Sequence, residues 1–185
     1  MRSPSYAYAF NQLGYVLLRN GEFTESLKAF AKAQELNPKI SFPIHNAAEV
    51  YCILEDLDQC RKFAEKGAKW ARTNSEKQFS HLTFAFLEIL SGSLEKAEEL
   101  VDRSLKIREN HPASLVTKGI VLNLNGQYAA SMDAFERALK ISPNYFEGEG
   151  KKGRHLLRGV YLASEQQHRA NIDVLLALTR DESRS

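Results

Sequence analysis

Small side chains recur at a nearly fixed interval along this chain, and this periodicity constrains the fold more than any other feature. Gly14, Ala48, Ala85 and Gly119 follow one another at intervals of 34, 37 and 34 residues. A second column lies twelve residues after the first, and a third lies seven residues after the second; they contain Ser26, Cys60, Ala97 and Ser131, and then Ala33, Gly67, Ser104 and Ala138. Helices that cross at short distance need small side chains at the crossing point. The columns therefore predict four similar helix pairs.

Helix-breaking residues support this division. Breakers fall in the middle of each predicted repeat, at Asn20-Gly21, Asp56, Ser91-Gly92 and Asn125-Gly126. Prolines fall between the repeats, at Pro38, Pro112 and Pro143, where a proline can open a turn or a helix but cannot continue a helix interior. The longer interval indicates a three-residue insertion within 73–77. We expect about ten helices, the last two after residue 144.

The pattern resembles the tetratricopeptide repeat, a 34-residue unit of two antiparallel helices with small residues at its eighth, twentieth and twenty-seventh positions. The first and fourth repeats match it best; the second has Glu55 in place of the inter-helix glycine, and the third has no closing proline. The resemblance implies an all-α, right-handed superhelical solenoid of about four tetratricopeptide helix-turn-helix repeats plus C-terminal helices. The expected repeats are 7–40, 41–74, 78–111 and 112–145 within a domain of residues 1–145, and 146–185 would form C-terminal capping helices or a degenerate fifth repeat.

Residues typical of catalysis or metal binding do not cluster. The five histidines are scattered, and Cys52 and Cys60 are eight residues apart, a spacing of neither a redox pair nor a zinc site. We expect both cysteines to be buried, reduced and structural. Glycine-rich phosphate loops and nucleophile motifs are absent from the sequence. We therefore predict a protein that is not an enzyme and that has no catalytic, cofactor-binding or metal site.

Charge and hydropathy limit the partners. The chain has 25 basic and 23 acidic residues, a balance that does not favour a nucleic-acid partner. No stretch approaches the roughly 18 apolar residues of a membrane-spanning helix, and the first twenty residues do not have the pattern of a signal peptide. We expect no membrane span and a cytoplasmic location.

The resemblance also implies where a partner binds, because the first helices of such repeats line a concave groove that accepts a protein or peptide. Ten residues at groove positions are the candidate partner-binding site: Tyr8, Asn11, Tyr15, Phe42, His45, Asn46, Glu49, Phe79, Phe86 and Asn123. Relatives that capture a C-terminal carboxylate use lysines, an arginine and asparagines at set positions; here only Asn46 matches, because the lysine positions hold Asn11 and Phe79 and the arginine position holds Thr83. We therefore predict a scaffold or adaptor that binds an apolar or amphipathic segment, with the aromatic residues as anchors and the asparagines bonding to its backbone.

Several alternatives remain open at this stage. The protein is alternatively a structural subunit of a larger assembly, or, as a less favoured reading, a helical-repeat RNA-binding protein; the groove positions contain only one arginine, Arg19. Some of the aromatic residues could pack between repeats instead of binding a partner. The apolar last helix, around Ile172 to Leu178, could pack across the last repeat, fill the groove or form a homo-oligomer contact.

Overall fold

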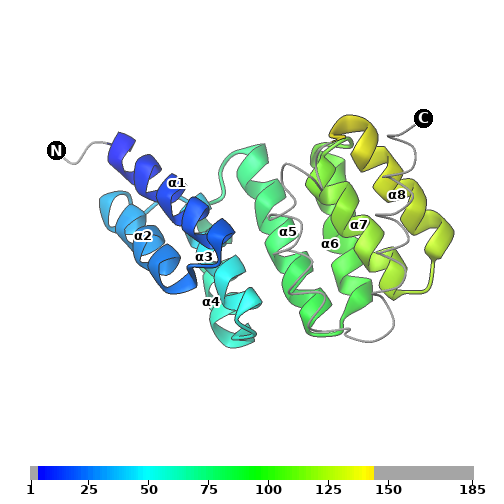
Figure 1. The fold of residues 1–185 in the computed structure, drawn as a ribbon, viewed down its shortest axis with the longest axis horizontal. Helices are drawn as coiled ribbons and strands as arrows, with labels where there is room; N and C mark the ends of the chain where they lie inside the picture. The colour runs from blue at the N-terminus through cyan, green and yellow to red at the C-terminus, as the bar shows by residue number, and fades with distance from the viewer. Residues whose placement is uncertain (1–3, 144–185) are drawn as a thin grey trace.

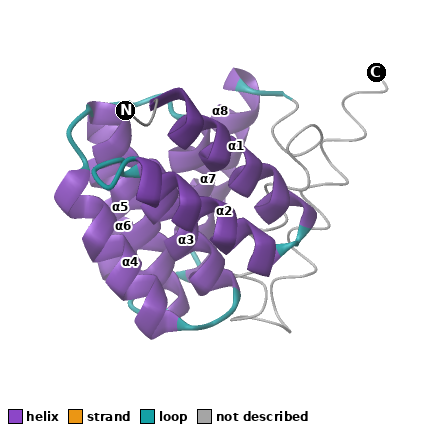
Figure 2. Ribbon diagram, turned by 90° about the vertical axis from the view of Figure 1, so that its left-hand side faces the viewer, coloured by secondary structure: helices purple, strands orange, loops and turns teal. Residues whose placement is uncertain are grey.

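The computed structural model describes residues 4–143, and these residues form eight α-helices and no strand (Figure 2). The helices, in chain order, are α1 (Pro4–Asn20), α2 (Phe23–Leu36), α3 (Phe42–Ile53), α4 (Leu57–Trp70), α5 (Asn74–Leu90), α6 (Leu94–Ile107), α7 (Pro112–Leu124) and α8 (Tyr128–Ile141). The predicted all-α class is confirmed for this part of the chain. The two helices expected after residue 144 lie outside the described residues.

The helices stack as hairpins along one direction (Figure 1). Each hairpin pairs a first helix with a second helix: α1 with α2, α3 with α4, α5 with α6, and α7 with α8. The second helix of one hairpin then packs against the first helix of the next. First helices also contact one another from hairpin to hairpin, whereas the described second helices make no comparable contacts among themselves. This asymmetry brings α1, α3, α5 and α7 together on one side of the stack, as expected for a curved repeat array.

The columns of small residues mark where the two helices of a hairpin touch. All twelve residues are buried. A Cβ atom added to Gly14 would lie 2.6 Å from the ring of Phe30, and one added to Gly119 would lie 2.8 Å from the ring of Phe135. Serine in the second column adds a hydrogen bond, because the hydroxyl of Ser26 donates to the Gly14 carbonyl oxygen at 2.8 Å. The periodicity therefore reflects close packing within each hairpin.

The turn inside each hairpin needs a left-handed residue. Gly21, Gly92 and Gly126 have φ angles of 81°, 76° and 75°, which glycine adopts without steric cost. Glu55 occupies the same position in the second hairpin and keeps a φ of 61°. The turn geometry is thus preserved without the glycine, at a conformational cost that falls on Glu55.

The three-residue insertion lengthens a helix instead of forming a loop. Helix α5 has 17 residues, compared with 12 in α3 and 13 in α7. It begins with a capping box, in which the Thr73 hydroxyl accepts from the Glu76 backbone N–H and the Glu76 carboxylate accepts from the Thr73 backbone N–H. The box satisfies N–H groups at the start of the longer helix.

The two cysteines are buried, as expected, but they are joined in a disulfide. The prediction that they are reduced is therefore wrong. Eight residues along one straight helix would separate their Cα atoms by about 12 Å. The turn between α3 and α4 instead brings the two Cα atoms to 5.1 Å, a separation that a disulfide can span.

Candidate protein-binding groove

The candidate partner-binding residues all come from the first helices, but they differ in exposure. Tyr8 is 61% exposed and Phe42 is 36% exposed. Tyr15, Glu49 and Phe79 are partly buried. The remaining five are buried: Asn11, His45, Asn46, Phe86 and Asn123. Only part of the predicted set is therefore open to a partner in this structure.

An aromatic cluster forms where the first helices of the second and third hairpins meet. The ring centroids of Phe42, on α3, and Phe79, on α5, are 5.8 Å apart. The His45 ring meets the edge of Phe79 at 5.7 Å with an interplanar angle of 72°. Such tilted and edge-to-face contacts are the favoured geometries of aromatic pairs. Phe79 thus both ties two repeats together and keeps a partly exposed surface next to Phe42.

Two predicted asparagines bond to each other across the first two hairpins. The Asn46 side-chain N–H donates to Oδ1 of Asn11 at 3.0 Å, and both amides are buried. A buried amide pair of this kind holds both side chains in a fixed orientation. Tyr8 precedes Asn11 by three residues and Phe42 precedes Asn46 by four, so this fixed polar pair lies on the same side of α1 and α3 as the two aromatic side chains.

His45 is a packing residue of the second hairpin. Its side chain is fully buried, and within the described residues neither ring nitrogen has a hydrogen-bond partner. A Cβ atom added to Gly67, on α4, would lie 2.7 Å from the ring, so the imidazole fits against the bare backbone of that glycine. Burial lowers the pKa of His45 to about 4, and the nearby Glu76 carboxylate opposes this shift only partly. The imidazole is therefore neutral at pH 7.

Three other predicted residues lie elsewhere on the first helices. Tyr15 packs beside the core formed by α1, α2 and α3, and the Arg19 guanidinium lies 5.4 Å from the centre of its ring. Phe86, on α5, belongs to a core cluster that includes Val116 and Ile120 of α7. Asn123 is 8% exposed near the end of α7. The burial of Phe86 assigns it to the packing between repeats, which was the alternative considered from the sequence.

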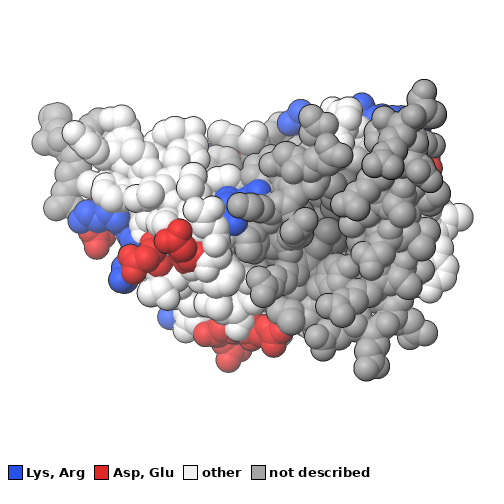
Figure 3. Space-filling view, viewed as in Figure 1, with Lys and Arg blue, Asp and Glu red and all other residues white. Residues whose placement is uncertain are grey.

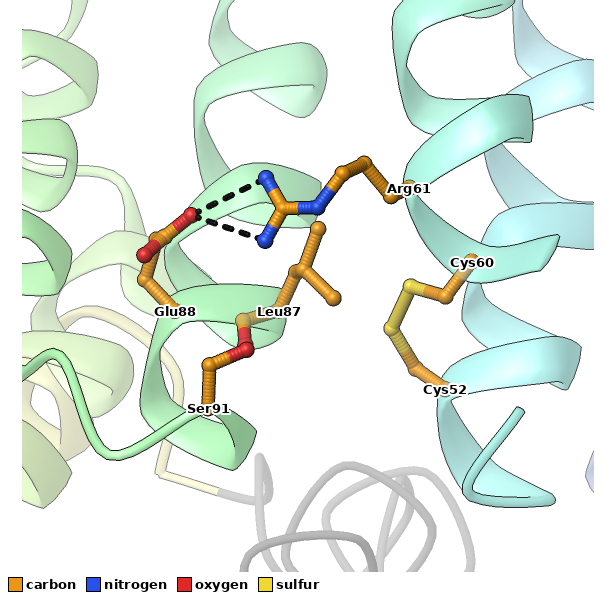
Figure 4. Close-up of polar contacts among 6 residues, drawn as sticks. All are labelled: Cys52, Cys60, Arg61, Leu87, Glu88 and Ser91. Atoms are coloured by element: carbon orange, nitrogen blue, oxygen red, sulfur yellow. Dashed lines mark hydrogen bonds and ion pairs between the residues drawn. A yellow bond between two sulfur atoms is a disulfide. The ribbon is translucent and has the colours of Figure 1, made fainter. Parts of the chain in front are cut away.

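Ion pairs between hairpins were not found by sequence reasoning. Arg61, on α4, reaches Glu88, on α5, with both terminal guanidinium nitrogens, Nη1 and Nη2, 3.4 Å from one carboxylate oxygen (Figure 4). In the same view the Cys52–Cys60 disulfide lies on the α3–α4 side of this contact. A comparison of equivalent positions could have identified these ion pairs from the sequence. Charged residues occur at a few positions where the other repeats have apolar residues.

A second ionic contact joins the third and fourth hairpins. The Lys118 ammonium, on α7, lies 2.6 Å from Asp102 and 3.0 Å from Glu98, both on α6. Partial burial would lower the pKa of Lys118, but the hydrogen bonds from these two carboxylates raise it overall. The pairs hold neighbouring repeats in register and so fix the relative positions of the first helices.

The described residues offer little for chemistry or membrane insertion. They contain no group of three or more His, Cys, Asp or Glu side chains placed to hold a metal ion. None of the helices between residues 4 and 143 is both long and apolar enough to cross a membrane. In Figure 3 the surface over the N-terminal part of α1 is largely uncharged, and charged side chains gather toward the lower edge of the first hairpins.

Comparison with known proteins agrees with this architecture. Residues 7–40 and residues 112–145 each match a family model described as tetratricopeptide repeat. No curated protein matches the sequence at a significant level.

Solved structures with this fold include a chain of the APC/C hetero-tetramer Cut9-Hcn1, with a TM-score of 0.68 and 17% identity over 100% of this chain and 38% of that one. This chain therefore spans well under half of that protein. TTC0263, a thermophilic TPR protein in Thermus thermophilus, has a TM-score of 0.62 and 16% identity over 94% of this chain and 98% of its own. YrrB, a TPR protein with an unusual peptide-binding site, has a TM-score of 0.50 and 14% identity over 94% of this chain and 90% of its own.

Tetratricopeptide repeats generally act as non-catalytic scaffolds for protein–protein interaction, through the extended surface that stacked helix pairs create. This chain thus contains tetratricopeptide repeats at residues 7–40 and 112–145, and its stacked hairpins share the fold of solved tetratricopeptide repeat proteins.

Proposed function

We propose that this protein is a scaffold that binds an apolar or amphipathic peptide segment along the first helices of its first three hairpins. The observation that carries the proposal is the set of aromatic side chains around the Asn11–Asn46 pair: Tyr8 and Phe42 are exposed, and Phe79 is partly exposed beside Phe42. Rigid aromatic anchors next to a fixed polar point are typical of protein-binding surfaces.

The groups available on this surface define the ligand. It presents aromatic rings and neutral amides, so a segment with apolar side chains at alternate or helical spacing fits better than an acidic tail. Because Asn11 and Asn46 already hold each other, a ligand would not have to order them, and the entropy lost on binding would be smaller. The similar structure of YrrB belongs to a protein with a peptide-binding site, which is consistent with the proposal.

The direct test is selection of binding peptides from a displayed random-peptide library on the purified full chain. Selected peptides would then be measured by fluorescence anisotropy against the wild type and a Tyr8→Ala/Phe42→Ala variant. Tyr8 is 61% exposed, whereas Phe42 also packs on Phe79, so circular dichroism and thermal melting of the variant should accompany the binding measurement. Loss of two aromatic anchors should weaken binding by at least about tenfold.

Tyr128→Ala is the matched control, since Tyr128 is 54% exposed at the start of α8, a second helix. Its affinity for the selected peptides should equal that of the wild type. Equal affinities of all three proteins would place the binding surface away from these first helices and refute the proposal.

A further inference from the structure

The side of α1 that faces away from the rest of the stack carries an apolar stripe. Tyr6, Leu13 and Val16 are 63%, 48% and 54% exposed, and the neighbouring Phe10 and Leu17 are partly exposed. These residues are spaced so that they share one face of a helix. We refer to them as the outer face of α1.

The other repeats show what this face is built to contact. Val16 corresponds to Val50, Leu87 and Val121, at the same intervals as the small columns, and all three are fully buried. In those repeats the first helix packs against the second helix of the preceding hairpin: α3 on α2, α5 on α4 and α7 on α6. Within residues 4–143 no helix precedes α1. The outer face is thus a helix-packing surface that none of the described helices covers.

Charge distinguishes this face from its internal counterparts. Leu13 corresponds to Lys118 in the fourth repeat, which pairs with a carboxylate on α6. Leu17 corresponds to Glu88 in the third repeat, which pairs with Arg61 on α4. Helix α1 has no acidic residue, and Arg19, near its end, is its only basic one. If a helix with charged residues like those of α4 and α6 packed on the outer face, its charges would lie unpaired against leucine, which is unfavourable.

An uncharged apolar face is instead complementary to itself. We propose that two copies of this chain associate through a two-fold interface in which the outer face of α1 packs against the same face of the second copy. A closed pair with identical patches is the commonest arrangement of homo-oligomers. The small, exposed Ala9 lies within the stripe between Tyr6 and Leu13, and a small residue allows two helices to approach closely. Such an interface of one helix face per copy is small, so we expect a dissociation constant on the order of micromolar.

The association is tested by sedimentation equilibrium of the full chain from about 1 to 200 µM, a range that brackets such an affinity. The wild type should form a reversible dimer. Leu13→Glu/Val16→Glu should raise the dissociation constant by about a hundredfold or more, because each copy then places two carboxylates in the contact, where burial and repulsion between like charges oppose association. Circular dichroism and thermal melting at low concentration should match the wild type, since both residues are exposed in the single chain.

Leu54→Glu is the matched control, because Leu54 is a 49% exposed leucine at the end of α3. It should leave the dimer intact. A wild type that stays monomeric over the whole range, or a double variant that dimerises as well as the control, would overturn the proposal.

Cross-linking tests the two-fold geometry independently. Leu13 lies near the middle of α1, so in an antiparallel α1–α1 contact it meets Leu13 of the second copy. Mild oxidation of Leu13→Cys should give a reducible covalent dimer, because the two thiols meet only in a two-fold contact, while Leu54→Cys stays monomeric. In the sedimentation experiment, wild-type species larger than a dimer would indicate a head-to-tail contact and exclude the two-fold one.

Discussion

Acid should destabilise this protein through one buried histidine, and His45→Leu should remove most of that effect. The imidazole of His45 is fully buried and has no hydrogen-bond partner on either nitrogen within the described residues. Its equivalents in the third and fourth repeats are Leu82 and Val116, so an aliphatic side chain suits this position. Protonation would place a positive charge between the Phe79 ring and the backbone of Gly67, with the Glu76 carboxylate offsetting it only partly.

The size and sign of the effect follow from the pKa. Burial lowers the pKa of His45 from 6.5 in the unfolded chain to about 4 in the folded protein. The unfolded state therefore binds a proton first as the pH falls. The stabilisation that depends on neutral His45 is complete above pH 6.5 and is lost progressively down to about pH 4. Each pKa unit corresponds to about 1.4 kcal/mol, so the total loss is about 3 kcal/mol, of which about 2 kcal/mol has occurred by pH 5.

Urea unfolding followed by circular dichroism at pH 7.5, 6 and 5 measures this loss. Between pH 7.5 and 5 the wild type should lose about 2 kcal/mol more unfolding free energy than His45→Leu. His81→Gln is the control, because the partly buried His81 also has a lowered pKa, from burial and from Arg103, but stands outside the aromatic cluster. It should keep most of the wild-type pH dependence. Equal pH dependence in His45→Leu and the wild type would refute the assignment of the effect to this residue.

Three further predictions concern the turns and the contacts between helices. Glu55→Gly should raise the unfolding free energy by about 1 kcal/mol in urea titrations, because glycine adopts the left-handed backbone conformation of this position without steric strain. Glu55→Ala should change the unfolding free energy by only a few tenths of a kcal/mol, and an equal gain from both variants would argue against backbone strain. Lys118→Met should lower the unfolding free energy by about 1 to 2 kcal/mol in the same assay, because Glu98 and Asp102 then face each other without a cation; a difference unchanged in 1 M salt would contradict an electrostatic origin. The two cysteines should resist alkylation in denaturant until a reductant is added, as read from the intact mass; labelling of both without reductant would show that the disulfide is absent.

The hairpins were predictable because their determinants are local and repeated. A ring such as Phe30 packs onto a bare backbone such as Gly14, and this steric requirement leaves small residues at one position in every repeat. The turn at Glu55 was recognised by its position despite the missing glycine. The Cys52–Cys60 bond was missed because residue spacing alone does not show how the turn between α3 and α4 brings the two Cα atoms together.

Exposure at the groove positions depends on neighbouring repeats and was less predictable. Asn11 and Asn46 both occupy groove positions of a repeat array, yet they bond to each other because one first helix packs on the next. Phe86 belongs to the core, and His45 packs against Gly67, contacts that involve residues on other helices. The family pattern identifies which helices line the groove, whereas the side chains contributed by adjacent helices decide which of those residues a partner can reach.

Helix α1 carries residues for both proposed surfaces, and their positions make the two proposals separable. Successive residues of a helix are rotated by about 100°, so Tyr8 and Tyr15 lie on average about 120° around α1 from Leu13 and Val16. A substitution on the groove side should therefore change peptide affinity and leave the dimer intact, while one on the outer face should do the reverse. Dimerisation through the outer face would leave both grooves accessible, and a partner carrying two copies of the bound segment would then bind more tightly than one copy through the raised effective concentration. Comparing single and tandem peptides on the wild type and on Leu13→Glu/Val16→Glu measures this gain, and a gain that persists in the monomeric variant would contradict the link between the two surfaces.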